Sequence, residues 1–295
     1  MVLNGIAEAL YQRIIKAHSD KHEFKVYIVM PLLPGFEGQI GEKTGTFLKA
    51  LIYWTNSSFN MGNKSLIQRL KTSIENPFQY ISICGLRKYT ELNDKLVTEL
   101  IYVHSKLLIM DDECCLIGSA NINDRSLLGD RDSEIAAIFK DNSNNMKNQQ
   151  NNTFCSTLRK NIFKEHFLGS KMDMDDKNNS DVQEKDFEDP SKDYFFHLWN
   201  TRAKNNTVAY NEIFRCIPTN DTTTLNSLAE YQKIAPLSQT NPNSALNQLS
   251  SRIKGRLVLF PLKFLIEEGE NLLTFPESTI KLPLGESSLI SRIYT

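Results

Sequence analysis

The sequence of 295 residues has no apolar run that approaches the ~20 residues needed to span a bilayer. It also opens without the basic and then apolar segments of a signal peptide. Neither sign of charge is in excess, because 34 Lys and Arg stand against 35 Asp and Glu, for a net charge of -1. This balance excludes the global basic field that attracts nucleic acid, although it leaves room for a local patch. We therefore expect a cytoplasmic protein whose membrane contact is peripheral, with no nucleic-acid partner.

Cysteine is scarce as well. The chain has five cysteines, an odd number, and their spacing fits no zinc-binding pattern. Reduced thiols in a cytosolic protein are the simplest interpretation of this set. The spacing therefore predicts neither a disulfide framework nor a structural metal site.

Hydrophobic residues make up 40% of the chain, enough for one large domain or two small ones. Apolar periodicity predicts helices over 4–18, 45–55, 64–74, 154–168 and 191–204, and strands over 24–30, 79–84, 135–139 and 255–262. Such an alternation of helices and strands favours an α/β sandwich. Two polar stretches, 141–153 and 170–188, interrupt the pattern, and we expect both to be disordered surface inserts.

The most informative feature is the octapeptide at 104–111, His-Ser-Lys-Leu-Leu-Ile-Met-Asp, which reads H-x-K-x4-D. Six residues later comes the tetrapeptide Gly-Ser-Ala-Asn at 118–121. A histidine can attack phosphorus or shuttle a proton, and Lys, Ser and Asn can hold phosphate oxygens where charge develops. The pattern predicts covalent chemistry on a phosphodiester. No second H-x-K occurs in the 295 residues, so we expect half of an active site.

The spacing also predicts a local structure. The apolar run 107–110 is typical of a buried strand, in which residues two apart share a face, so His104 and Lys106 should point at one ligand. Residues 111–113 predict a tight turn, and 114–117 should return as the second strand of a hairpin. Ser119 and Asn121 should again share a face. The alternative is a structural histidine whose hydrogen bonds are made within the fold. This alternative does not explain why Lys106, Ser119 and Asn121 occur at matching positions along the strands.

These residues match the HKD signature of the phospholipase D superfamily at every position. The flanking segments 98–103, 122–126 and 131–134 also resemble it. The block Pro-Leu-Leu-Pro-Gly-Phe-Glu-Gly at 31–38, the segments 214–218 and 255–261, and the final Tyr-Thr pair are similar to the eukaryotic phosphatidylcholine-specific phospholipases. The resemblance covers most of the chain and identifies 1–295 as a C-terminal catalytic half, with 98–125 as the region of the second HKD motif.

The resemblance implies a phospholipase D-type α/β sandwich half, with a central mixed sheet flanked by helices. In that family two HKD motifs meet, one histidine forms a phosphohistidine, and the other protonates the leaving alcohol and then activates water or another alcohol. The chemistry itself needs no metal or other cofactor. The expected reaction is hydrolysis of phosphatidylcholine to phosphatidic acid and choline, or transphosphatidylation to an alcohol. The expected partners are a phospholipid surface and either an N-terminal HKD half or a second copy of the chain.

Each candidate residue has a predicted role and an ordinary alternative. His104 is the nucleophile or the general acid and base, and Lys106 supplies positive charge to the phosphate, unless it is a surface lysine. Ser119 and Asn121 are phosphate donors, or caps of the hairpin turn. The resemblance makes Glu134 the residue that orients a catalytic histidine, where the alternative is a strand-edge carboxylate. Asp111 is the aspartate of the HKD motif, but its position after an apolar strand suggests that it has a structural role in holding the turn. Phe36 and Glu37 follow the Pro-Gly break at 34–35 and are expected to border the site, with a structural role as the alternative.

Three further hypotheses stand beside the enzyme. The chain could be a non-catalytic half that binds lipid head groups or a partner and regulates a longer relative. It could be part of a longer natural protein, or it could pair His104 with its copy across a dimer. A missing half predicts a sizeable apolar surface where that half would dock.

Overall fold

The computed structural model describes residues 2–141, 153–169 and 182–274. These residues form two sheets. The first contains β1 (Val26–Val29), β2 (Ile81–Leu92), β3 (Lys95–Ile101) and β7 (Leu257–Leu259). β2 lies at its centre, parallel to β1 and antiparallel to both β3 and β7. This sheet is mixed and flanked by helices, which confirms the predicted fold class.

The second sheet has three antiparallel strands in the order β4 (Lys106–Met110), β5 (Cys114–Gly118) and β6 (Ala136–Lys140). The helices of the described residues are α1 (Ile6–Ser19), α2 (Thr46–Phe59), α3 (Leu66–Lys71), α4 (Asp124–Leu127), α5 (Phe154–Leu168), α7 (Asp193–Phe214), α8 (Leu225–Lys233), α9 (Leu237–Thr240) and α10 (Pro242–Arg252). Short 3-10 helices are η1 (Lys43–Gly45), η2 (Pro77–Gln79), η5 (Glu184–Phe187) and η6 (Ile266–Leu273). None of the helices in the described ranges has the length and apolar character to cross a membrane.

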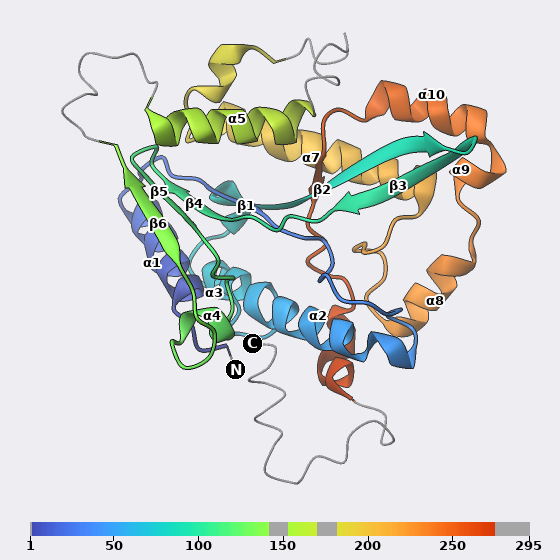
Figure 1. The fold of residues 1–295 in the computed structure, drawn as a ribbon, viewed down its shortest axis with the longest axis horizontal. Coiled ribbons are helices and arrows are strands. Elements are labelled where there is room, and N and C mark those ends of the chain that lie inside the picture. The colour runs from blue at the N-terminus through green and yellow to red at the C-terminus, as the bar shows by residue number, and fades with distance from the viewer. Residues whose placement is uncertain (1, 142–152, 170–181, 275–295) are drawn as a thin grey trace.

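Strand β2 shows why the first sheet lies at the centre of a sandwich. Ile81 and Ile83 belong to one core, with side chains of α1 and α3, whereas Cys84 and Leu86 belong to another, with side chains of α5 and α7. Alternate residues of a strand point to opposite faces, so both faces of β2 are buried along its first seven residues. Figure 1 shows α5 and α7 on one side of this sheet and α1, α2 and α3 on the other.

Aromatic side chains fill the core between α5, α7 and the sheet. Phe195 and Trp199 of α7 are 1% and 0% exposed, and their rings contact Phe163 and Phe167 of α5. Full burial of one such side chain contributes about 1.5–3 kcal/mol. These aromatics form part of the core, and α7 continues ten residues past its predicted end because burial continues to Ile213.

Some elements were not predicted. β3 pairs with β2 through a two-residue turn, Asn93-Asp94, whose φ values of 50° and 58° are both left-handed. Asn and Asp tolerate this conformation, so the turn carried a signal in the sequence. Residues 142–152 and 170–181 of the two predicted inserts lie outside the described residues. The last part of the second insert is ordered in the structure, since η5 lies there and Phe187 packs in the aromatic core.

Candidate active site

The motif forms the predicted hairpin. β4 and β5 pair from Lys106 with Gly118 to Met110 with Cys114, and residues 111–113 close the turn. The backbone N–H of Glu113 donates to the carbonyl of Met110 at 3.0 Å. Asp111 and Asp112 occupy the turn with φ of 53° and 58°. Asp tolerates this left-handed region better than most residues, so these types suit the turn.

His104 lies outside the strand, in the coil between β3 and β4. The prediction that His104 belongs to the strand of Lys106 was therefore wrong. The reason is that the ladder of β4 and β5 ends at the pair of Lys106 and Gly118, and the backbone N–H of the following Ser119 donates to the carbonyl of Ile135 instead. Instead, the ammonium of Lys106 donates to the backbone carbonyl of His104 at 2.7 Å.

A cavity of about 410 Å³ lies beside the start of the hairpin. It is lined by the ends of the two motif strands and by one side chain of α5, namely His104, Ser105, Lys106, Leu107, Ile117, Gly118, Ser119 and Leu158. A Cβ at Gly118 would lie 2.7 Å from the carbonyl oxygen of Ile135 and 2.8 Å from Ala136 Cβ. Gly118 is therefore required by the close approach of β6.

Ser119 and Glu134 meet directly. The Ser119 hydroxyl donates to the Glu134 carboxylate, and it accepts a hydrogen bond from the Ile135 N–H at 3.0 Å. Hydrogen bonds from Ser119 and Ser126 lower the pKa of Glu134 below its usual value, and the nearby charge of Lys106 acts in the same direction. Lys106, Ser119 and Glu134 are thus gathered into one group. The predicted role of Glu134 in orienting a histidine stays a prediction, since its described contacts are with these serines.

The segment after the Gly-Ser pair is held by a short helix. Asn123 caps α4 by accepting from the Ser126 N–H at 3.0 Å, and the Ser126 hydroxyl in turn accepts from the Asn121 N–H at 3.2 Å. The Asn121 carboxamide is exposed and has no hydrogen-bond partner among the described residues. Buried Asp124 accepts three hydrogen bonds from Leu3 and Asn4, which ties the start of the described chain to this helix. These bonds fix the backbone on which Asn121 stands.

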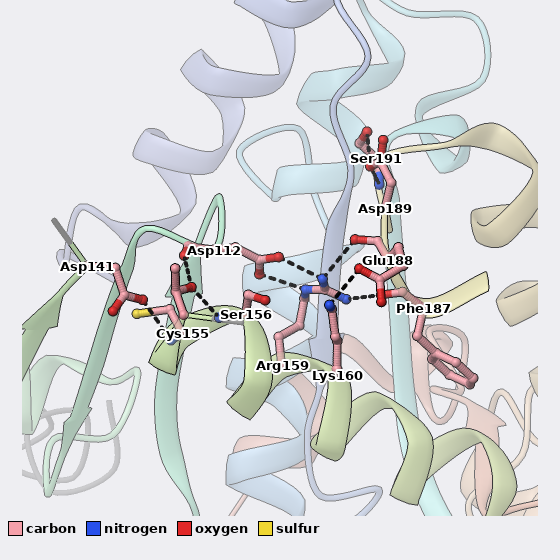
Figure 2. A network of polar contacts seen from close by, with 11 residues as sticks. Asp112, Asp141, Cys155, Ser156, Arg159, Lys160, Phe187, Glu188, Asp189 and Ser191 are labelled. Atoms are coloured by element: carbon pink, nitrogen blue, oxygen red, sulfur yellow. Dashed lines mark hydrogen bonds and ion pairs between the residues drawn. The ribbon is translucent and has the colours of Figure 1, made fainter. Parts of the chain in front are cut away.

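The far end of the hairpin is bound to α5 (Figure 2). Arg159 donates two hydrogen bonds to the Asp112 carboxylate, and two more to the carbonyls of Phe187 and Glu188. Lys160 pairs with the Glu188 carboxylate at 2.6 Å. Asp111 makes no such pair among the described residues, in keeping with its predicted role in the turn. It is Asp112 that forms the ion pair of this turn, with Arg159, and the sequence did not predict a role for Asp112.

The N-terminus of α5 is fixed to the same sheet. The carboxylate of Asp141, which follows β6, accepts from the N–H groups of Phe154 and Cys155. A carboxylate at a helix N-terminus satisfies donors that have no partner within the helix. These backbone hydrogen bonds lower the pKa of Asp141. Helix α5 is therefore held at both the hairpin tip and the end of β6, and it places Leu158 against the cavity.

Comparison with known proteins points to the same family as the motif. The family model described as phospholipase D matches residues 87–201, which include β4, β5 and the residues around the cavity. The chain is 42% identical over 273 residues to phospholipase D2 of Bos taurus, covering 90% of this chain and 28% of that protein. The chain belongs to the phospholipase D family.

Other relatives extend this result. The chain is 42% identical over 276 residues to phospholipase D1 of Homo sapiens, covering 91% of this chain and 25% of the relative. It is 36% identical over 300 residues to phospholipase D zeta 2 of Arabidopsis thaliana, covering 94% and 28%. The chain thus spans about a quarter of the length of the curated relatives it matches. All five cysteines are free thiols, and no group of acidic, His and Cys side chains in the described ranges is arranged to hold a metal.

Proposed function

We propose that the chain supplies one HKD motif of a phospholipase D that hydrolyses phosphatidylcholine to phosphatidic acid and choline, with transphosphatidylation when an alcohol replaces water. The observation that carries this proposal is that His104, Lys106 and Ser119 line one cavity, with the Glu134 carboxylate bonded to the Ser119 hydroxyl. An imidazole, an ammonium and a hydroxyl at one place are the groups that phosphodiester cleavage through a phosphohistidine requires. The relatives' names support the substrate class.

In the proposed reaction one histidine attacks phosphorus and forms a P–N bond as the P–O bond to choline breaks. A second histidine gives its proton to the departing oxygen and then takes a proton from water, which attacks phosphorus and releases phosphatidic acid. His104 fills one of these two roles. Lys106, Ser119 and Asn121 hold the non-bridging oxygens, where negative charge develops. Asp111 holds the turn that positions the strand of Lys106.

We further propose that a partner bearing the other HKD motif covers the exposed face of the three-stranded sheet. Leu108, Leu116 and Ile138 are register partners across β4, β5 and β6, so they share a face. Leu108 and Ile138 are 49% and 61% exposed. Lys106 lies on this same face, two residues from Leu108. A partner that buries this apolar face would therefore close over the proposed phosphate-binding lysine.

The first test is choline release and phosphatidylbutanol formation from phosphatidylcholine vesicles, with the chain alone and with a separately expressed part that bears the other motif. We expect activity with the second part present, and none when His104 is replaced by Ala. His197→Gln is the matched control, because His197 is an exposed histidine on α7. Full activity of His104→Ala in the complemented enzyme would overturn the proposal. Activity of the chain alone that disappears in His104→Ala would favour a self-complementing dimer.

A second candidate function is a non-catalytic half that binds lipid or a partner. The exposed apolar face favours it, since such a face suits binding whether or not chemistry follows. Binding of the chain to vesicles or to the second part, without turnover in any combination, would select this function over the enzyme.

A further inference from the structure

Tyr102 lies in the coil between β3 and β4, two residues before His104. The residues 102–105 have no strand partner, so no ladder fixes the side chains of this stretch. The Tyr102 side chain is also not fixed by burial, because it is 46% exposed. Two neighbours of its ring, His104 and Gly35, define where the ring lies.

The first neighbour is His104. The ring centroids of Tyr102 and His104 are 6.0 Å apart and their planes are tilted by 32°. This separation lies within the range at which aromatic rings attract one another. Among the described residues, Tyr102 is the aromatic side chain whose ring lies against the imidazole. The hydrogen bond from Lys106 goes to the backbone carbonyl of His104 and does not hold its ring.

The second neighbour is Gly35, in the segment 31–38 that the sequence places near the site. A Cβ at Gly35 would lie 2.9 Å from Cε2 and Cζ of Tyr102 and 3.0 Å from its hydroxyl oxygen. Gly35 is not among the glycines with positive φ. A larger residue at this position would therefore force the Tyr102 ring to shift, and the φ of Gly35 does not itself require glycine.

We propose that Tyr102 is the positioning residue for the His104 imidazole. Its ring lies against the His104 imidazole, and Gly35 provides the space in which that ring lies. A reacting imidazole must hold both distance and orientation toward phosphorus or the leaving oxygen, and a small displacement lowers the rate strongly. This inference rests on the proposed function for its catalytic consequence, but its geometric claim is independent of any activity.

The geometric claim is tested by NMR on the 295-residue chain with isotope-labelled histidine, in which loss of one signal set in His104→Gln assigns His104. A neighbouring aromatic ring shifts the protons of an imidazole through its ring current. We expect Tyr102→Leu to move the His104 ring protons, and Tyr102→Phe to leave them close to their native positions. Tyr194→Leu is the control, because Tyr194 is exposed on α7. Unchanged His104 signals in Tyr102→Leu would overturn the proposal.

Gly35→Ala tests the other contact. We expect it to move the His104 signals, whereas Gly41→Ala should not, since an added Cβ at Gly41 meets nothing within 4 Å. If Gly35→Ala fails to fold, the two Tyr102 variants still decide the claim.

The catalytic consequence is measured in the complemented enzyme. We expect Tyr102→Leu to lower kcat by up to about 100-fold, with a small change in KM, and Tyr102→Phe to restore kcat. An unchanged kcat in Tyr102→Leu would exclude the positioning role. A complemented wild-type enzyme without turnover would count against the proposed function, and the NMR result would still decide where the Tyr102 ring lies.

Discussion

The guanidinium of Arg159 meets both carboxylate oxygens of Asp112, with N–O distances of 2.7 Å for each. The Arg159 side chain is 6% exposed, and its remaining hydrogen bonds go to two backbone carbonyls. One buried side chain thus joins the turn of the motif hairpin, helix α5 and the segment after η5. A planar guanidinium suits this task because its donors point in fixed directions.

Asp112→Ala should therefore destabilise the chain strongly. The substitution leaves Arg159 buried without a counter-charge, and breaking a buried pair in this way costs about 3 kcal/mol. The measurement is the free energy of unfolding in urea. Glu230→Ala is the control, since the Glu230–Lys233 pair is exposed and its loss should change stability by less than about 1 kcal/mol. Equal losses in the two variants would contradict the structural role of the Arg159–Asp112 pair.

His166 predicts a loss of stability in acid. Burial lowers its pKa from 6.5 to about 4, and its Nδ1 has no hydrogen-bond partner among the described residues. The unfolded chain therefore binds a proton at higher pH than the folded chain. Above about pH 6.5 the group has no effect on stability, and stability falls as pH falls from 6.5 toward 4, by about 3 kcal/mol in total.

The measurement is urea unfolding at a series of pH values for the native chain and for His166→Gln. We expect the slope of stability against pH between 4 and 6.5 to be smaller in the variant. His197→Gln is the control, because it makes the same substitution at an exposed histidine of α7. Parallel curves for the native chain and His166→Gln would show that His166 is not the group responsible.

Ser119→Ala should raise the pKa of Glu134 toward its ordinary value. The Ser119 hydroxyl is the leading cause that keeps this pKa low, because its hydrogen bond stabilises the carboxylate. The pKa is read from the side-chain carboxyl carbon by NMR titration. Glu8 is an internal reference, since its lowered pKa depends on Gln12 and Arg69 and should not change. A Glu134 midpoint that stays in place would mean that the Ser119 bond does not form in solution.

The sequence predicted the hairpin because its signals are local. An apolar run, an Asp-Asp-Glu turn and a returning apolar run can be read within the 11 residues 107–117, and the structure has the predicted pairing. The hairpin follows from the periodicity of strands, which depends on neighbouring residues alone.

What the sequence did not predict depends on contacts between distant segments. Arg159 and Asp112 are 47 positions apart, and an arginine in an otherwise polar helix face looks solvated. Tyr102 was only part of a matching flank, because one of its ring neighbours, Gly35, comes from a segment far away in the sequence. His104 was wrongly predicted to lie in β4 for a related reason. The strand begins only where β5 pairs with it, at Lys106 and Gly118, and the motif alone does not show where this pairing stops.

Ile138→Asp should separate folding from association. Ile138 is 61% exposed in the middle of β6, so a charge there remains hydrated and should change the free energy of unfolding by less than about 0.5 kcal/mol. If the proposed partner covers this face, the same charge would be buried without a counter-charge, and binding of the separately expressed part should weaken more than tenfold. Sedimentation of mixtures measures the binding. Ile234→Asp, which changes an exposed residue after α8, should leave binding unchanged. Native binding by Ile138→Asp would place the partner elsewhere, and the exposed side chains over Lys106 would then need a different explanation.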